Sequence, residues 1–92
     1  MVQVELTTHL YTFFPALRGV PLQLEAATIA EVVRGLDSLA PGIGFYICDE
    51  RGRLRQHVNV FIGNDMIRDR RTLSDPVAAG DKVSILQALS GG

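Results

Sequence analysis

Apolar and polar residues alternate with a period of two in several stretches of the chain, which is typical of strands with one buried face. The stretches are residues 2–6, 20–24, 57–62 and 82–89, with a short return strand beginning at residues 66–67 after a turn at residues 63–65. In the last stretch Val83 and Ile85 share one face, and Ser84 and Leu86 share the other. The pattern therefore predicts four to five strands.

A helical period takes over between the second and third strands. The apolar residues of one helical face are Ile29, Val32, Val33, Leu36 and Leu39. Thr28 and Glu31 match a capping box, in which the two residues satisfy N–H groups at the start of a helix. Pro41-Gly42 ends the segment. One helix is therefore expected over residues 29–39.

The remaining segments are predicted to be connections or short extended pieces. Residues 9–15 are apolar without a clean period and link the first two strands. Residues 45–48, Phe-Tyr-Ile-Cys, are expected to form a short strand or extended segment. Charge and glycine content predict loops at residues 49–53 and 68–71. We expect one domain over residues 1–88 and a flexible tail over residues 89–92.

One helix and these strands need a common core, so the helix must cover one face of a mixed sheet. The first and last strands are both apolar enough to be central, and we expect them to lie side by side. The predicted fold is therefore an α+β β-grasp (ubiquitin-like) fold, with four to five strands on one helix.

Composition limits the classes of function. The chain of 92 residues has a net charge of −1, which gives no bulk attraction to nucleic acid or to anionic membranes. No apolar run approaches the roughly 20 residues that span a bilayer, and the first residues do not form a signal peptide. Cys48 is the only cysteine, so no internal disulfide is possible. We expect a soluble cytoplasmic protein that binds neither membrane nor nucleic acid directly.

Few side chains are candidates for chemistry within the domain. His9 and His57 lack the neighbouring ligands of a metal site, so no metal is expected. Cys48 has no paired basic residue nearby in sequence and is expected to be a small core residue. Six arginines fall in or just after the two charged loops, at positions 51, 53, 55, 68, 70 and 71. They could attract an acidic partner or RNA, but the acidic residues among them favour solvated loops.

The last three residues, Ser90-Gly91-Gly92, carry no side chain larger than a hydroxyl. Burial cannot hold such a segment, so we expect it to protrude. A glycine pair can enter a narrow slot that a larger residue would block. The terminal carboxylate of Gly92 is therefore the leading functional group, although the dipeptide alone is equally typical of a frayed end or a cloning remnant.

The ordered set of motifs is similar to the MoaD/ThiS family of ubiquitin-like sulfur carriers. The motifs are Thr28-Ile29-Ala30-Glu31-Val32-Val33, Val58-Asn59-Val60-Phe61-Ile62 with Asn64-Asp65, Leu73 to Asp75, Gly80-Asp81-Lys82-Val83-Ser84-Ile85-Leu86, and Gly91-Gly92. The long connection from Pro41 to His57 and the C-terminal segment resemble CysO-type carriers more than short ThiS proteins. The chain is therefore expected to be a CysO-like or MoaD-like carrier. Gln87 stands where several relatives carry proline.

The resemblance implies that an E1-like adenylating enzyme uses ATP to activate the Gly92 carboxylate. A sulfur nucleophile then displaces AMP and leaves a thiocarboxylate, which donates sulfur to an acceptor enzyme. The domain itself would bind no cofactor and would not be an enzyme. Phe61 and Leu86 are predicted on the outer face of the sheet, and with Leu89 they are the candidate partner-binding residues, unless residues 10–14 fold over that face.

Two other functions stay open at this stage. The chain could be the small subunit of an enzyme complex similar to molybdopterin synthase, or a ubiquitin-like modifier that forms isopeptide bonds. The acceptor also stays open, since cysteine, thiamin, molybdenum cofactor, thiolated tRNA and secondary metabolites can all begin from the same thiocarboxylate.

Overall fold

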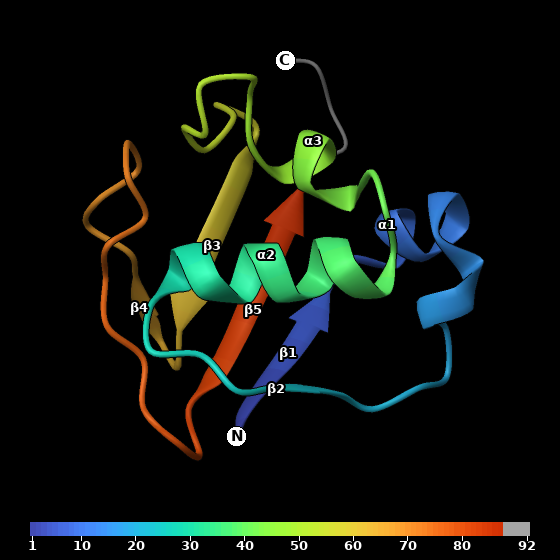
Figure 1. Cartoon of the computed structure of the whole chain (residues 1–92), viewed down its shortest axis with the longest axis horizontal. Coiled ribbons are helices and arrows are strands. Elements are labelled where there is room, and N and C mark those ends of the chain that lie inside the picture. Colours follow the sequence, from blue (N-terminus) through green and yellow to red (C-terminus); the bar gives the residue numbers. More distant parts are fainter. Residues whose placement is uncertain (88–92) are drawn as a thin grey trace.

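The computed structural model describes residues 1–87, and its five strands form one mixed sheet in the order β2-β1-β5-β3-β4 (Figure 1). The elements are β1 (Val2–Leu6), α1 (Thr8–Phe13), the 3-10 helix η1 (Pro15–Leu17), β2 (Leu22–Leu24), α2 (Ile29–Leu39), α3 (Ile43–Ile47), β3 (Val58–Ile62), β4 (Asp65–Met66) and β5 (Lys82–Gln87). Within residues 1–87 no helix is long and apolar enough to cross a membrane.

The last strand lies in the middle of the sheet. β5 pairs in parallel with β1, with Val4 opposite Val83, and antiparallel with β3, with Val60 opposite Ile85. β2 and β4 are the edge strands, each antiparallel to its neighbour. The predicted adjacency of the first and last strands is therefore confirmed.

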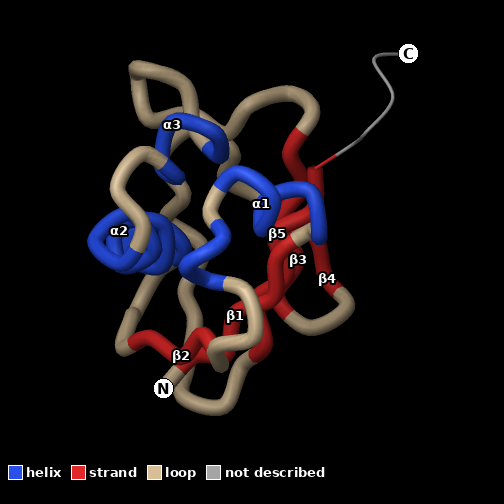
Figure 2. The backbone as a smooth tube through the Cα atoms, turned by 90° about the vertical axis from the view of Figure 1, so that its right-hand side faces the viewer, coloured by secondary structure: helices blue, strands red, loops and turns tan. Residues whose placement is uncertain are grey.

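The core lies between the sheet and α2. Figure 2 shows α2 and α3 on one side of the strands, whereas α1 overlaps the strands in this view. The inward side chains of α2 (Ile29, Val32, Leu36) and of β5 (Val83, Ile85) are all fully buried. The inward side chains of the predicted strands and the apolar side chains of the predicted helix therefore pack together in one core.

The limits of α2 agree with the sequence prediction. Thr28 is the N-cap, and its Oγ1 accepts a hydrogen bond from the Glu31 N–H at 3.3 Å. The Glu31 side chain reaches back to accept from the Ala27 N–H at 3.1 Å. Leu39 is an error of the prediction, because it is 53% exposed rather than buried. It is the last helical residue and lies at the edge of the apolar stripe, beyond Leu36.

Residues 45–48 were predicted as extended, and this was wrong, because α3 covers Ile43–Ile47. Ile43 and Ile47 are four residues apart and both fully buried, which a helix allows and which leaves Phe45 exposed. The Asp37 carboxylate accepts hydrogen bonds from the N–H groups of Gly42 and Gly44, at 3.2 and 3.0 Å. This side chain from α2 satisfies free N–H groups at the start of α3, a contact that the local sequence does not reveal.

Residues 9–15 also contain a helix that the sequence did not predict. In α1 only Leu10 is buried, so the segment has no repeating apolar stripe. The short helix therefore depends on tertiary packing rather than on amphipathic periodicity.

Thr7 joins the ends of β1 and β5. Its N–H donates to the Ile85 carbonyl at 3.1 Å, and its Oγ1 donates to the same carbonyl at 3.3 Å. The same Oγ1 accepts from the Gln87 N–H at 2.8 Å. Proline at position 87 has no N–H and could not make this last bond. Thr7 therefore holds the last described residue of β5 against β1.

We predict that Thr7→Val lowers the free energy of unfolding by about 1–2 kcal/mol, because it removes the hydroxyl and leaves the Gln87 N–H without its acceptor. Denaturant unfolding measures the change, and the exchange rate of the Gln87 amide proton should rise in the same variant. The matched control is Thr8→Val, at an exposed neighbouring position without a side-chain hydrogen bond in residues 1–87. Equal stabilities of the two variants would exclude this role of the Thr7 hydroxyl.

Candidate functional site

The candidate site lies where β5 ends. β1 and β5 run in parallel, so both end at the same edge of the sheet, next to α3 and the loop of residues 49–57 (Figure 1). The predicted site residues Leu89, Ser90, Gly91 and Gly92 lie outside the described residues, as does the predicted boundary between domain and tail. The site that the structure describes is therefore the surface around Gln87.

Three apolar side chains form a patch on the face of the sheet turned away from α2, which we call the outer patch (Phe61, Met66, Leu86). Leu86 faces Asn59, and Phe61 faces Ser84, so Leu86 and Phe61 are diagonal neighbours on one face. Met66 is directly opposite Phe61 on β4. Leu86 is 43% exposed and Met66 49%. Phe61 and Leu86 thus share the predicted face, and Met66 joins them.

The segment that could have covered the outer patch packs elsewhere. The ring of Phe13 lies 5.1 Å from the ring of Tyr46 in α3, and the ring of Phe14 lies 5.3 Å from it. Leu10, in the same segment, is buried in the core. The rings of Phe13 and Phe14 therefore pack against α3, and Leu86 stays exposed.

The rest of the outer face is polar. Gln3 and Gln23 face each other on β1 and β2. Lys82 pairs with Glu5 at 3.0 Å, and both side chains are about half exposed. An exposed pair of this kind contributes little to stability. The outer face therefore changes from polar side chains on β1 and β2 to the outer patch, which lies on β3, β4 and the end of β5.

A shallow groove of about 360 Å³ lies at the end of β5, and we call it the root groove. It is lined by Phe45, Tyr46, Arg55, His57 and Gln87. The Arg55 Nε donates to the Phe45 carbonyl at 2.6 Å, which ties the loop to α3. The Gln87 Oε1 is buried and has no hydrogen-bond partner within residues 1–87. Sequence reasoning missed Phe45 and Tyr46 because it assigned them to a strand.

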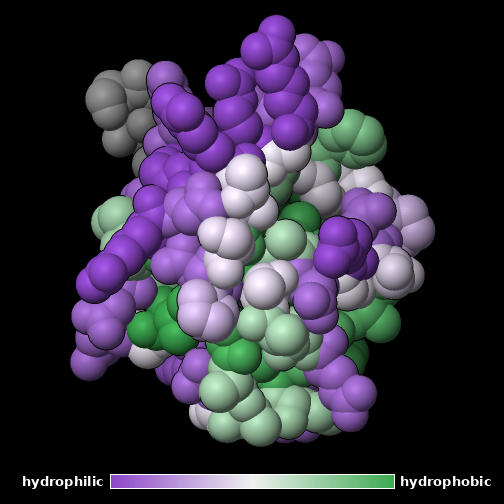
Figure 3. Space-filling view, turned by 60° about the vertical axis from the view of Figure 1, so that its left-hand side comes forward, coloured by the Kyte–Doolittle hydropathy of each residue, from purple (hydrophilic) through white to green (hydrophobic). Residues whose placement is uncertain are grey.

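A second groove, of about 510 Å³, continues from the root groove, and we call it the arginine groove. Its charged lining is Asp49, Arg53, Arg55, Arg70 and Arg71, and His57 also lines it. The two arginine runs that the sequence assigned to separate solvated loops are therefore neighbours in space. Figure 3 shows hydrophilic side chains gathered in the upper part of this side of the molecule.

Arg70 connects the two loops of the arginine groove. Its Nη2 donates to the Arg55 carbonyl at 2.8 Å and to the Val58 carbonyl at 2.9 Å. The Leu54 N–H donates in turn to the Arg70 carbonyl at 2.8 Å. Because these contacts link residues far apart in sequence, no local motif indicates them.

Asp69 organises the second of these loops. Its carboxylate accepts from the hydroxyls of Ser74 and Thr72 and from the N–H groups of Arg71 and Thr72. These hydrogen bonds, that of the Ser74 hydroxyl first, hold the pKa of the Asp69 carboxyl well below its usual value. The charged carboxylate therefore fixes the backbone that carries Arg70 and Arg71.

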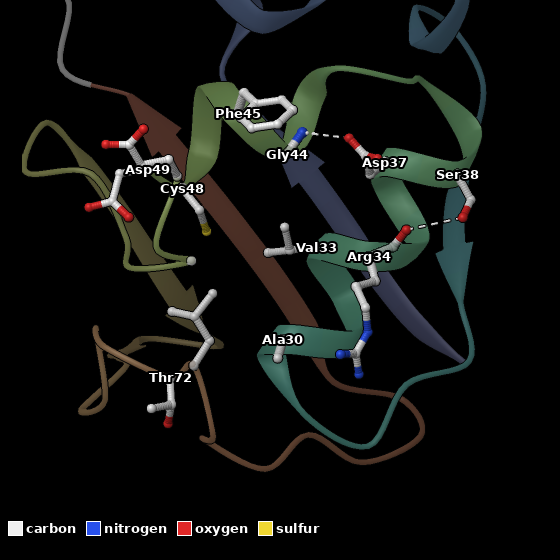
Figure 4. Close-up of a pocket in the computed structure, with 13 residues that line it drawn as sticks. Ala30, Val33, Arg34, Asp37, Ser38, Gly44, Phe45, Cys48, Asp49 and Thr72 are labelled. Carbon is white, nitrogen blue, oxygen red and sulfur yellow. Dashed lines mark hydrogen bonds between the residues drawn. The ribbon is translucent and has the colours of Figure 1, made fainter.

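A third cavity, of about 550 Å³, lies between α2, α3 and the loops, and Cys48 lines it (Figure 4). Cys48 is only 6% exposed, which confirms its prediction as a core residue. Burial, and next the negative charge of Asp49, raise the pKa of the Cys48 thiol. The nucleophilic thiolate is disfavoured there. Within residues 1–87, no three His, Cys, Asp or Glu side chains are grouped as a metal site would require.

Comparison with known proteins identifies the family. A family model described as "ThiS family" matches residues 11–92. The chain belongs to the ThiS family. It is 31% identical over 67 residues to the "Sulfur carrier protein CysO" of Mycobacterium tuberculosis, a match that covers 71% of this chain and 72% of the relative. The resemblance stated from the motifs is therefore confirmed.

Solved structures show the same fold. A complex of BexX and CysO from Amycolatopsis orientalis contains a chain with a TM-score of 0.84 and 27% identity, and the match covers all of both chains. Mycobacterium tuberculosis CysO matches with a TM-score of 0.82 and 27% identity, over 97% of this chain and 100% of that one. SAMP1 from Haloferax volcanii, at 22% identity and a TM-score of 0.73, shares the fold, over 99% of this chain and 98% of that one. The predicted β-grasp fold is confirmed.

We predict that Asp69→Asn lowers the melting temperature at neutral pH and that the difference from the wild type shrinks as the pH falls. A carboxyl with a depressed folded-state pKa stabilises the fold above its unfolded pKa, about 3.9, and this contribution is lost as the pH falls through the folded-state pKa. Thermal unfolding between pH 7 and pH 2 measures the effect.

The control for Asp69 is Asp65→Asn, which changes an exposed aspartate of β4 without a side-chain hydrogen bond in residues 1–87. A difference between Asp69→Asn and the wild type that stays constant down to pH 2 would contradict a stabilising role of the charged carboxylate.

Proposed function

We propose that this chain is a sulfur carrier whose Gly92 carboxylate is converted to a thiocarboxylate by partner enzymes. The observation that carries the proposal is the family match, which extends through the terminal Gly91-Gly92 and includes β5. The relatives at 31% identity are named sulfur carrier proteins.

The chemistry of a carboxylate explains why partners are needed. A carboxylate is a poor electrophile, and ATP makes it reactive by forming an acyl-adenylate with loss of pyrophosphate. A sulfur nucleophile then displaces AMP, and the thiocarboxylate that results carries an anionic sulfur able to attack an acceptor. In this proposal the adenylating partner uses the ATP, and a separate donor supplies the sulfur. This chain therefore acts as a protein substrate and not as the catalyst.

The described residues fit the role of a domain that partner enzymes bind. β5 is held by ladders on both sides and by Thr7 at its end, so its terminal direction is fixed. Leu86 and Met66 of the outer patch are exposed near the end of β5. The apolar core of a partner interface can form on this patch. We assign Phe61, Leu86 and Leu89 to partner binding, and Met66 joins them on the patch.

Two alternatives use the same carboxylate and differ in the acceptor. As a small subunit of a synthase complex, the chain would remain bound to a large subunit after sulfur transfer. As a modifier, its carboxyl group would form isopeptide bonds with lysines of other proteins. Co-purification with a large subunit favours the first alternative, and a ladder of conjugates in cells favours the second.

We predict that incubation with ATP, the cognate E1-like enzyme and a sulfur source replaces one carboxyl oxygen of Gly92 by sulfur. Intact-protein mass spectrometry detects the change, and the chain lacking Gly92 is the control. No mass gain with an adenylating enzyme that is active on another carrier would reject the sulfur-carrier function.

A second prediction tests the outer patch. Leu86→Arg should raise the KM for the carrier in the adenylation reaction roughly tenfold or more, because a charge would replace an apolar contact at the interface. Leu39→Arg is the matched control, since Leu39 is also exposed, at 53%, but lies on α2 on the other side of the sheet. ATP–pyrophosphate exchange measures the KM, and equal values for the two variants would place the interface elsewhere.

A further inference from the structure

The arginine groove concentrates positive charge in a chain that is slightly acidic as a whole. Its lining contains four arginines and one aspartate, a net charge of +3. The whole chain has a net charge of −1, so the other residues together carry −4. The chain is therefore polarised, with one basic groove and an acidic remainder.

The arginines of the groove divide into two kinds. Arg70 is a structural residue, since its guanidinium holds the carbonyls of Arg55 and Val58. Arg71 is exposed and makes no side-chain hydrogen bond within residues 1–87. Arg53 pairs with Asp49 at 3.4 Å, with its side chain 49% exposed. Arg53 and Arg71 therefore have donors free for an external anion.

The groove is continuous with the end of β5. Arg55 and His57 line both the arginine groove and the root groove, and Gln87 lines the root groove. An anionic group bound between Arg53 and Arg71 would thus lie along a surface that leads to the last described residue of β5. Exposed Phe45, at 66%, adds an apolar contact beside it.

We propose that the arginine groove binds an acidic segment of the partner enzyme that receives the C-terminal glycines, and so orients the chain as it docks. This inference rests on the proposed function. A guanidinium binds a carboxylate with two parallel hydrogen bonds, and complementary charge speeds and orients encounter. A short acidic segment fits better than a nucleic acid, since a long polyanion would extend beyond the groove and meet the acidic remainder of the chain.

The test uses two double variants with the same change of charge. Arg53→Gln with Arg71→Gln removes the two arginines of the groove that have donors available to an external anion, and keeps Arg55 and Arg70, whose guanidinium groups bind backbone carbonyls. Arg18→Gln with Arg34→Gln removes two exposed arginines elsewhere. Asp49→Asn removes the only acidic residue of the groove, while its side chain can still accept from the N–H groups of Arg51 and Arg53.

The first measurement needs no enzyme. NMR titration of the full chain with a hexaglutamate peptide should shift the amide signals of the arginine groove. The groove double variant should bind roughly two- to thirtyfold more weakly, the Arg18/Arg34 variant like the wild type, and Asp49→Asn more tightly. The differences should shrink as salt rises from about 0.05 to 0.5 M. Equal binding by all variants, or shifts elsewhere, would overturn the proposal, as would tighter groove binding of a uridine dodecamer.

The second measurement separates this inference from the proposed function. In adenylation by the cognate E1-like enzyme, the groove double variant should show a raised KM and an almost unchanged kcat, and the Arg18/Arg34 variant should match the wild type. If the wild type is adenylated and both double variants match it, the groove inference fails and the carrier function stands. If the wild type is not adenylated, the carrier function fails, and the peptide titration decides whether the groove binds acidic segments.

Discussion

The central position of β5 is the constraint on which the rest of the structure depends. Val83 and Ile85 are fully buried and contact the core from the middle of the sheet, between β1 and β3. The pairing of β5 with β1 closes the chain across almost its whole length, so the fold cannot form until the C-terminal strand is in place. The same strand leads to the C-terminal glycines, and the ladders with β1 and β3 and the Thr7 hydrogen bond hold it up to Gln87.

The sequence predicts those parts whose pattern is local and repeated. The alternation in β1, β3 and β5 and the stripe of α2 each report a buried face directly, and the fold follows from the need to share one core. The prediction was wrong where a single tertiary contact determines the local structure. The start of α3 depends on hydrogen bonds to the Asp37 side chain of α2. Leu39 is exposed because it is the last residue of α2 and lies at the edge of the apolar stripe.

The candidate site divides in the same way. Phe61 and Leu86 could be placed on the outer face from strand periodicity alone, because successive side chains alternate. The arginine groove could not be anticipated, since it needs two loops that are brought together by contacts between Arg70 and the backbone of Arg55 and Val58. The acidic residues Asp49, Glu50 and Asp69 lie among the arginines in the sequence, so both loops were predicted to be solvated surface. Asp69 in fact turns its charge inward, toward the backbone and hydroxyls of its own loop, and leaves Arg71 exposed.

A sulfur carrier is a protein substrate of other enzymes, so it influences their reactions by how it is bound and by where its terminus points. The described residues form two surfaces near the end of β5 that a partner could bind. One is the outer patch on the sheet, and the other is the arginine groove between the loops. Apolar contacts contribute affinity without fixing direction, whereas charged hydrogen bonds are directional. A partner that used both would hold the domain in one orientation, and the chain leaving Gln87 would then enter the partner from a defined direction. The rigidity of β5 makes that orientation effective, because a loosely held strand end would let the terminus move independently of the surfaces that the partner grips.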